Sequence, residues 1–419
     1  MSVDVVTLGC RLNTFESEVM RSHAIRAGAH DRDRDCIIVN TCAVTREAER
    51  QARQTIRKLK REKPDARIVV TGCAAQLNPG QFADMDEVSQ VLGNEEKLAP
   101  DFLDRDEIPV RVSDIMAVSE TAPHLVAGFE ERTRAFVQVQ QGCDHRCTFC
   151  IIPFARGRNR SVGLGALVDQ VQLLVDGGYR EVVLTGVDIC SYGADLPGQP
   201  RLGATVRRLL DLVPGLQRLR LSSLDPAAMD DDLFQLLADD DRFQPHLHLS
   251  LQAADDMVLK RMKRRHSRDD AARVIDRARS YRADVVFGAD IIAGFPTETD
   301  AMFQNTLRFI DEYDLIHCHV FPYSEREGTP AARMPAVEKA VRKARAAALR
   351  EAGARRLKAW LASRVGETEV VLAETETRGR TSHFANVHWS GRAKAGELVE
   401  VRITGETGDH LTGDLVWGT

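Results

Sequence analysis

The segment QGCDHRCTFC, Gln141 to Cys150, places Cys143, Cys147 and Cys150 within eight residues. Three thiolates at this spacing can ligate three irons of a 4Fe-4S cluster and leave the fourth iron without a protein ligand, whereas four cysteines suit an electron-transfer cluster. The alternatives are a zinc site, which normally closes with four ligands, and a redox-active thiol pair. The spacing favours a cluster that can bind a further molecule at its open iron.

The amino and carboxylate groups of S-adenosylmethionine can chelate such an iron, and reductive cleavage of that molecule yields a carbon radical. Phe149 stands where a loop of this kind places an aromatic side chain against the bound adenine. The segment resembles the radical S-adenosylmethionine superfamily. The segments IIPFARGRNRS, Ile151 to Ser161, and LGCRLNTFESE, Leu8 to Glu18, are similar to the methylthiotransferase family. Shorter similar segments occur at 40–42, 71–73, 246–252, 294–298 and 321–332.

The chain has 419 residues, with 57 Lys and Arg against 62 Asp and Glu, a formal net charge of -5. About 150 residues per domain suggests roughly three domains. This net charge does not attract nucleic acid, so an RNA site must be a local basic patch. The sequence has no run of about 18 apolar residues and no secretion signal, and its nine cysteines fit a reducing compartment. We expect a cytoplasmic protein without a membrane segment.

Residues 1–118 alternate strand and helix patterns and predict a parallel α/β domain. Cys10, Cys42 and Cys73 each follow a different predicted strand. The carboxyl ends of parallel strands meet at one crevice, beside helix N-termini that favour an anionic group, so the three cysteines should converge there. For each cysteine alone, an ordinary buried thiol is the alternative. The family resemblance implies that they ligate an auxiliary 4Fe-4S cluster that takes part in sulfur transfer.

Residues 130–360 contain six predicted strands separated by helices. Repeated βα units predict parallel strands, and six units predict a partial (β/α)6 radical-SAM barrel with an open mouth. The cysteines of 143–150 follow the first strand, at the face where barrel enzymes carry their chemistry. Histidines alternate at 246, 248, 317 and 319, and we interpret them as barrel-lining or core residues without an accompanying carboxylate. The six strands are expected at 135–141, 180–186, 218–223, 246–252, 285–294 and 315–321.

Other strand ends at this face predict a pocket for S-adenosylmethionine. The resemblance implies that the second strand end holds the methionine amino group, the third reaches the ribose, and a glycine-containing segment approaches the adenine. Relatives commonly carry an amide at Asp188 and Ser-Gly at Ala253 and Ala254, although a carboxylate can bond an ammonium group more strongly. Any one of these residues could instead be an ordinary turn residue. The expected cofactor-binding residues, besides Phe149, are Thr185, Gly186, Asp188, Ser222, Ser223, Gln252, Gly294, Pro296 and Phe321.

Residues 361–419 follow a basic helix, roughly Val337 to Leu361, and predict a small β-barrel that resembles the RNA-binding TRAM domain. Residues 362–419 hold six basic and nine acidic side chains, so this barrel is not basic overall. The basic runs of the chain are most often solvated helix faces, but together they could follow a phosphate backbone. The strands are expected at 368–373, 383–389, 397–403 and 410–417, the basic groups at 46–63, 260–268, Arg378, Arg380, Arg392 and Lys394, and stacking aromatics at Phe384, His388 and Trp389.

The resemblance implies a tRNA methylthiotransferase with two 4Fe-4S clusters and S-adenosylmethionine. In such an enzyme a deoxyadenosyl radical removes hydrogen from an aromatic carbon, the auxiliary cluster delivers sulfur, and a second S-adenosylmethionine supplies the methyl group. Anticodon-loop bases are natural targets because they unstack without breaking a duplex. We expect a monomer that binds the tRNA anticodon loop and an unidentified electron donor, with no catalytic residue assigned beyond the cluster ligands.

Within the family, LGCRLNTFESE, LRLSSLDP and HVFPYSEREGTPAARMP are most similar to the branch that modifies N6-threonylcarbamoyladenosine immediately 3′ of the anticodon. The first alternative is the branch that modifies N6-isopentenyladenosine in tRNA. The second modifies an aspartate of a ribosomal protein, and its members usually have proline where this chain has Arg11. Outside the class, a noncatalytic iron-sulfur RNA-binding protein is the alternative.

Overall fold

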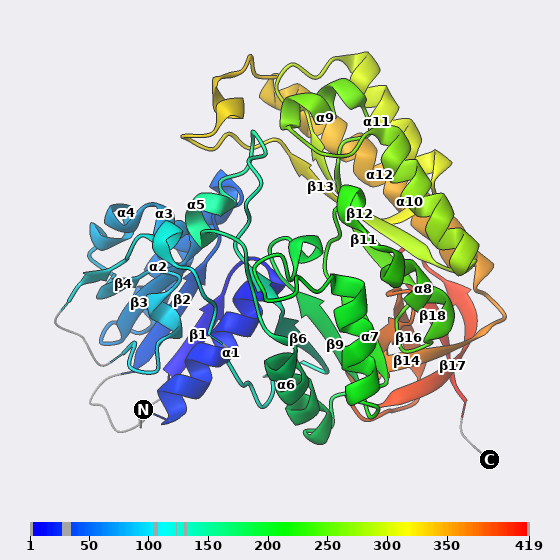
Figure 1. Ribbon diagram of the computed structural model, residues 1–419, viewed down its shortest axis with the longest axis horizontal. Coiled ribbons are helices and arrows are strands. Elements are labelled where there is room, and N and C mark those ends of the chain that lie inside the picture. The colour runs from blue at the N-terminus through cyan, green and yellow to red at the C-terminus, as the bar shows by residue number, and fades with distance from the viewer. Residues whose placement is uncertain (1–2, 27–34, 104–107, 123, 130–131, 417–419) are drawn as a thin grey trace.

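The computed structural model describes residues 3–26, 35–103, 108–122, 124–129 and 132–416. It confirms the expected architecture of an α/β domain, a partial barrel and a small closed β-barrel (Figure 1). Trp417, at the end of the last expected strand, lies outside the described residues. Among the helices in these ranges, none is long and apolar enough to cross a membrane.

The N-terminal domain is a five-stranded parallel sheet whose strands follow sequence order, β1-β2-β3-β4-β5. The first three strands are the apolar runs that the sequence predicts, and β2 is buried throughout, as the interior of a parallel sheet requires. Strands β4 and β5 are too short for a hydrophobic pattern to mark them. The strands are β1 (Val3–Thr7), β2 (Cys36–Thr41), β3 (Arg67–Gly72), β4 (Gln90–Leu92) and β5 (Val110–Arg111); the helices are α1 (Arg11–Arg26), α2 (Arg46–Glu62), α3 (Cys73–Leu77) and α4 (Pro79–Ala83).

Local sequence sets the ends and the orientation of α2. The side chain of Thr45 accepts a hydrogen bond from the Ala48 N–H and caps the N-terminus, with acidic residues in the first turn and basic residues in the last, as the helix dipole favours. Only Ala52 and Ile56 of this helix are buried. The remaining, mainly charged surface of α2 therefore faces solvent.

The second part forms the predicted six-stranded partial barrel. Strands β6, β9 and β10 make one parallel group and β11, β12 and β13 another. Isolated bridges from Leu219 to Phe243 and from Leu224 to Leu249 connect the groups, so the order is β6-β9-β10-β11-β12-β13. The strands are β6 (Arg134–Gln138), β9 (Glu181–Thr185), β10 (Arg218–Leu221), β11 (His246–Gln252), β12 (Val286–Ala293) and β13 (Leu315–Pro322).

Helices cover the outside of the barrel, as Figure 1 shows for α6, α7 and α10 to α12. Phe15 and Val19 of α1 belong to the same buried apolar cluster as Ala135 and Val137 of β6. Apolar burial therefore fixes the N-terminal domain against the first barrel strand. The helices are α6 (Leu164–Asp176), α7 (Leu202–Leu212), α8 (Asp231–Asp239), α9 (Asp256–Met262), α10 (Arg268–Tyr281), α11 (Asp300–Glu312) and α12 (Lys339–Ser363), with 3-10 turns at Glu96–Leu98, Ile115–Ala117, Ile189–Ser191, Pro226–Ala228 and Pro330–Arg333.

The C-terminal barrel closes in the order β14-β15-β16-β18-β17. The sequence did not predict β15, because its residues RGRT contain no apolar side chain. Strand β16 alternates exposed and buried residues, and Trp389 is one of its buried core side chains. Trp389 is therefore a packing residue and not an exposed stacking surface. The strands are β14 (Thr368–Ala373), β15 (Arg378–Thr381), β16 (Asn386–Ser390), β17 (Leu398–Glu406) and β18 (Leu411–Leu415).

Candidate active site between the domains

The loop that carries Cys143, Cys147 and Cys150 is closed at its base by the short antiparallel pair β7 (Gln140–Gln141) and β8 (Arg160–Ser161). The N–H of Cys150 donates to the carbonyl of Cys147 at 3.1 Å. Gly142 has a φ of +70°, and a Cβ added there would overlap the carbonyl oxygen of Arg158. The backbone of the loop is thus held in shape by its own contacts, and position 142 requires glycine.

The three thiols of this loop are free, partly buried and close enough to interact electrostatically. Burial raises the pKa of Cys143 to about 12, and the Asp188 carboxylate adds to the effect. Burial likewise raises the pKa of Cys150 to about 12, with a contribution from Cys147. Thiolates at these positions require added positive charge, which the irons of a bound cluster supply. The donor set therefore fits a three-cysteine iron-sulfur cluster.

Cys10, Cys42 and Cys73 follow β1, β2 and β3, and the structure brings them to one edge of the sheet. Burial raises the pKa of Cys42 to about 12, and the thiols of Cys73 and Cys10 raise it further. Gly9, with a φ of +107°, lies so close to β2 that an added Cβ would be 2.7 Å from the Cβ of Cys42. Gly72, with a φ of +96°, is equally crowded by the end of β2. Glycines directly before two of the cysteines permit the three to converge.

A buried network of charges surrounds Cys73. Arg156 ends α5 (Ile152–Arg156), and its Nε lies 3.2 Å from the Cys73 Sγ. The same guanidinium donates to Glu16 at 2.7 Å and to Asn13 at 2.6 Å, and Lys97 donates to Glu16 at 2.7 Å. Burial alone would raise the pKa of Glu16, but the charges of Arg156 and Lys97 lower it to about 2. Two cations face one carboxylate, so the network favours an anionic, thiolate-ligated group at this site.

The end of β9 lies beside the cysteine loop. Thr185 is buried, and Gly186 has no space for a side chain, since an added Cβ would be 2.8 Å from β7. The Oδ2 atom of Asp188 lies 4.0 Å from the Cys143 Sγ and 2.9 Å from Nε2 of His145. The structure therefore brings the Asp188 carboxylate to the first cysteine of the loop, where it can meet an ammonium group.

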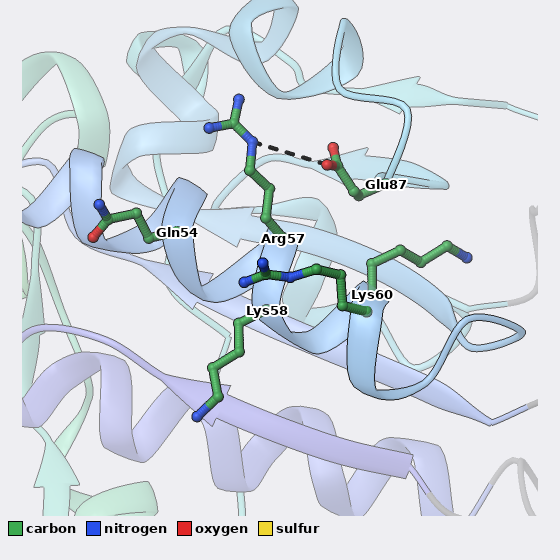
Figure 2. Close-up of a pocket in the computed structure, with 6 residues that line it drawn as sticks. Gln54, Arg57, Lys58, Lys60 and Glu87 are labelled. Atoms are coloured by element: carbon green, nitrogen blue, oxygen red, sulfur yellow. Dashed lines mark ion pairs between the residues drawn. The ribbon is translucent and has the colours of Figure 1, made fainter.

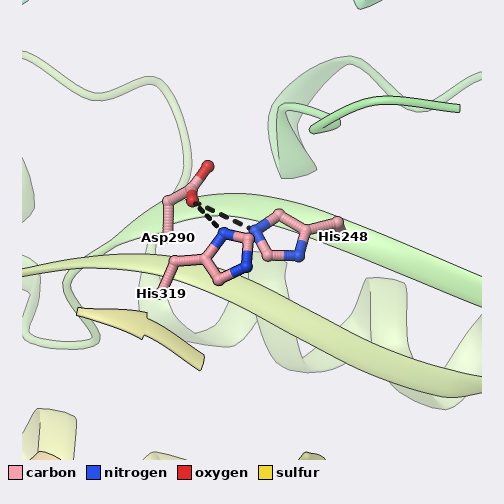
Figure 3. A group of neighbouring side chains, drawn as sticks. All are labelled: His248, Asp290 and His319. Atoms are coloured by element: carbon pink, nitrogen blue, oxygen red, sulfur yellow. Dashed lines mark hydrogen bonds and ion pairs between the residues drawn. The ribbon is translucent and has the colours of Figure 1, made fainter. Parts of the chain in front are cut away.

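A second group of side chains lies on β11, β12 and β13 (Figure 3). Asp290 Oδ1 lies 3.1 Å from His248 Nε2 and 3.2 Å from His319 Nδ1, and the hydroxyl of Ser223 donates to Oδ2 at 3.0 Å. The two imidazoles and the carboxylate could hold a metal ion, but these hydrogen bonds already engage both carboxylate oxygens. The prediction that no carboxylate accompanies these histidines is wrong. The partners come from adjacent strands and not from adjacent positions in sequence.

The remaining expected cofactor residues are spread over the same face of the barrel. Gln252 has a φ of +65° after a register shift in β11, and the space beside Gly294, at a φ of +70°, is filled by the Arg342 side chain. Phe149 packs edge-on against Phe295, with ring centroids 6.5 Å apart. Ser222 and Pro296 are buried, and Phe321 is exposed. Contact of these residues with S-adenosylmethionine stays a prediction.

Sequence reasoning missed two arginines beside the cysteines, Arg156 and Arg264. Nη1 of Arg264 lies 3.8 Å from the Cys147 Sγ, and the guanidinium pairs with Asp225 at 3.2 Å. The basic run 260–268, expected as an RNA patch, is therefore partly committed to internal contacts, and Arg265 pairs with the same aspartate. A separation of 117 positions between Arg264 and Cys147 leaves no local pattern that could have revealed this contact.

Helix α2 carries a basic surface hollow of about 680 Å³ (Figure 2). Its lining residues are Gln54, Arg57, Lys58, Lys60, Arg61 and Glu87, and Arg57 forms an ion pair with Glu87 at 3.8 Å. Four cations against one carboxylate make a local positive surface on a chain whose total charge is negative. A surface of this kind can follow a phosphate backbone.

Two family descriptions match the chain. The radical SAM superfamily matches residues 137–310, which include the cysteine loop and most of the barrel. The uncharacterized protein family UPF0004 matches residues 2–93, which include Cys10, Cys42 and Cys73.

Curated relatives extend the match to nearly the whole chain. The threonylcarbamoyladenosine tRNA methylthiotransferase MtaB of Rickettsia prowazekii is 49% identical over 96% of this chain and 94% of its own. The protein of the same name from Aquifex aeolicus is 34% identical over 96% of this chain and 100% of its own. A tRNA-2-methylthio-N(6)-dimethylallyladenosine synthase of Cereibacter sphaeroides is 34% identical over 98% of this chain and 97% of its own. These matches confirm the resemblance drawn from the cysteine motifs.

Solved structures share the fold. The radical S-adenosylmethionine methyltransferase TsrM from Kitasatospora setae superposes with a TM-score of 0.56 at 15% identity, covering 79% of this chain and 74% of that chain. The cobalamin-dependent S-adenosylmethionine radical enzyme OxsB superposes with a TM-score of 0.50 at 12% identity, covering 79% of this chain and 54% of that chain. At these identities the likeness confirms the fold alone.

Proposed function

Because the chain belongs to the tRNA methylthiotransferase family of radical S-adenosylmethionine enzymes, we propose that it converts N6-threonylcarbamoyladenosine, immediately 3′ of the tRNA anticodon, to its 2-methylthio derivative. One observation carries this choice of substrate. The relative named for that nucleoside is 49% identical over nearly the whole chain, whereas the relative named for dimethylallyladenosine is 34% identical. Isopentenyladenosine is therefore the second candidate substrate.

In this proposal Cys143, Cys147 and Cys150 hold the cluster that binds S-adenosylmethionine. Asp188, 4.0 Å from the Cys143 Sγ, receives the ammonium group of the methionine moiety, and Phe149 packs against the adenine. The charge-assisted contact at Asp188 orients the molecule, since an ionised acceptor binds an ammonium group more strongly than a neutral amide does. The other expected cofactor residues surround this position.

Cys10, Cys42 and Cys73 hold a second cluster in the N-terminal domain. Their meeting at one sheet edge and the buried cations Arg156 and Lys97 support this assignment. When bound, the two clusters and S-adenosylmethionine supply a carbon radical, a sulfur atom and a methyl group. The protein holds the substrate base between the two sites and keeps water away, which supplies the proximity that the reaction needs.

The three parts of the chain then have distinct roles. Residues 1–118 carry the second cluster, residues 130–360 carry the radical chemistry, and residues 361–419 form a TRAM-like barrel that contacts RNA. The basic hollow on α2 supports an electrostatic contact with the tRNA backbone. We further propose that the protein is a monomer in the cytoplasm and receives electrons from a separate donor.

Nucleoside mass spectrometry of tRNA from a strain lacking this gene tests the substrate. Loss of 2-methylthio-N6-threonylcarbamoyladenosine, with the 2-methylthio isopentenyl nucleoside unchanged, is expected, and the reverse pattern would favour the second candidate. A noncatalytic iron-sulfur protein is tested separately. Anaerobically reconstituted wild type with reductant and S-adenosylmethionine should release 5′-deoxyadenosine, and Cys147→Ala should not; silence of the wild type would reject the enzyme.

A further inference from the structure

A cavity of about 320 Å³ lies where the three parts of the chain meet. Cys10 and Arg11 line it from the start of α1, Arg220 from β10, and Arg380 and Phe384 from the C-terminal barrel. A proposed cluster ligand therefore shares a cavity with arginines from two other parts of the protein. A group bound here would lie next to the site that we assign to sulfur transfer.

The lining of this cavity is strongly positive, with five arginines and a single carboxylate, Glu374. Arg134 pairs with Glu374 and, at 3.3 Å, with the buried Glu181. Arg220 pairs with Glu181 at 2.9 Å, and Arg380 with Glu374 at 3.2 Å. Two carboxylates thus serve three arginines before the remaining arginines of the lining are counted. The cavity has spare positive charge for an anion.

Arg11 is free to bind that anion. Within the described part of the chain it makes no hydrogen bond or ion pair, and its guanidinium lies 5.8 Å from the ring centroid of Phe384. Arg11 is also the first residue of α1, whose first turn contains no acidic residue. A cation at the positive end of a helix dipole is unfavourable for the helix itself, whereas an anion held between the two is favourable.

Phe384 organises the arginines around it. The guanidinium carbon of Arg380 lies 4.4 Å from its ring centroid, that of Arg134 lies 5.0 Å away and that of Arg220 lies 5.2 Å away. His246 stacks on the ring at 5.2 Å with an interplanar angle of 10°. Phe384 has a φ of +67°, a conformation that is strained for a side chain of this size and that is often kept for function.

We propose that Arg11 binds the carboxylate of the threonylcarbamoyl group, so that this cavity selects the substrate nucleoside. The inference rests on the proposed function and names the residue that would set its specificity. A guanidinium can meet a carboxylate with two parallel hydrogen bonds. An isopentenyl group is uncharged and would leave the arginine unpaired in the cavity, which a site built for a polar group strongly disfavours. A tRNA phosphate is the competing anion.

The experiment compares reconstituted wild type, Arg11→Gln, Arg11→Lys and the control Arg308→Gln, whose side chain is exposed on α11. Each is titrated with anticodon stem-loop RNAs that carry N6-threonylcarbamoyladenosine, the same nucleoside with its carboxylate converted to a carboxamide, or N6-isopentenyladenosine. Fluorescence anisotropy gives the Kd. The wild type should bind the carboxylate RNA about tenfold or more tightly than the carboxamide RNA, the range expected for a charged hydrogen-bonded pair.

Arg11→Gln should lose this ratio without weakening the carboxamide RNA, Arg11→Lys should retain part of it because the charge remains, and Arg308→Gln should match the wild type. Equal weakening of all three RNAs would assign Arg11 to a phosphate and overturn the proposal, as would an unchanged ratio in Arg11→Gln. Iron content and circular dichroism check each variant, and Arg11→Lys carries the test if Arg11→Gln does not retain its iron. Methylthiolation of the threonylcarbamoyl RNA by wild type keeps the proposed function intact whichever way the ratio falls.

Discussion

The Nε atom of Arg156 lies 3.2 Å from the Sγ atom of Cys73, although 83 positions separate the two residues in sequence. Arg156 ends α5, directly after the cysteine loop of the barrel, and Cys73 begins α3 of the N-terminal domain. One buried guanidinium therefore connects the two sites that we assign to clusters. Because Glu16 accepts two further hydrogen bonds from it, removal of Arg156 leaves that carboxylate with Lys97 as its remaining cation.

Arg156→Met should reduce the free energy of unfolding by about 3 to 5 kcal/mol, the usual cost of removing one partner of a buried ion pair. It should also lower the iron bound by the N-terminal cysteines, because their thiolates lose a nearby cation. Urea denaturation and iron analysis after anaerobic reconstitution measure these effects. The matched control is Arg158→Gln, since Arg158 pairs with Asp144 in solvent, and its loss should change the unfolding free energy by about 0.5 kcal/mol or less. Equal behaviour of the two variants would contradict the role of Arg156.

Gly72→Ala should destabilise the N-terminal domain and prevent the second cluster from forming. The residue has a φ of +96°, and an added Cβ would overlap the backbone of Thr41. The steric conflict displaces Cys73 from its position at the end of β3. Iron content after reconstitution should fall to that of a single cluster, with 5′-deoxyadenosine release retained.

Gly165→Ala is the control for that substitution. Gly165 lies in α6, where a Cβ has open space, so the replacement should stabilise the protein by about 0.4 to 1 kcal/mol. Thermal unfolding compares the two variants. A Gly72→Ala protein with wild-type iron content and melting temperature would show that the crowding at Gly72 does not determine the geometry of this site.

The sequence predicted the elements whose pattern is strong. Apolar runs gave β1 to β3 and the six barrel strands, because buried parallel strands are continuous hydrophobic segments. The short strands β4 and β5 and the polar β15 escaped, since tertiary pairing and not local pattern determines them. The spacing of the loop cysteines and the position of Cys10, Cys42 and Cys73 after strands were likewise local features, available without coordinates.

The contacts that tune the site were not predictable in this way. Arg156, Arg264 and Asp290 act through partners on other strands or other domains, and their sequence neighbours carry no sign of those partners. Phe384 illustrates the same limit, because an aromatic residue in a small barrel is more often core than cavity lining. Only the arrangement of the three parts showed that its ring faces Arg11 and Arg380.

Acidification should weaken the folded protein through His317. Burial lowers the pKa of this imidazole to about 3 from an ordinary value of 6.5, and its Nε2 lies 3.0 Å from the carbonyl of His383. Between these pH values the unfolded chain binds a proton that the folded chain does not, so stability is present above the unfolded pKa and is lost as pH falls below it. The slope is at most about 1.4 kcal/mol per pH unit for one group. Urea titrations at pH 7, 6 and 5 measure it, and His317→Gln should flatten the dependence; an unchanged slope would contradict the assignment.

The basic hollow on α2 should contribute to tRNA affinity by releasing counterions. Replacing Arg57, Lys58 and Arg61 together with Gln should weaken tRNA binding and reduce the salt dependence of log Kd by up to about three charges. Filter binding over a range of KCl concentrations measures both quantities. Arg273→Gln, an exposed residue of α10 on another surface, should change neither. A uniform loss of affinity with an unchanged salt slope would show that α2 does not contact phosphates.

Asp188→Asn should weaken binding of S-adenosylmethionine by roughly fivefold, since a neutral amide replaces an ionised acceptor for an ammonium group. The carboxylate lies 2.9 Å from His145 Nε2 and accepts from the Ser191 hydroxyl at 2.7 Å, so the substitution keeps a hydrogen-bonding group in the same position. Equilibrium dialysis with labelled S-adenosylmethionine gives the Kd, and iron content confirms that the adjacent cluster is intact. Asp176→Asn, on the exposed surface of α6, serves as the control. Wild-type affinity in Asp188→Asn would place the ammonium group elsewhere, because a carboxylate in contact with it cannot be neutralised without a measurable loss.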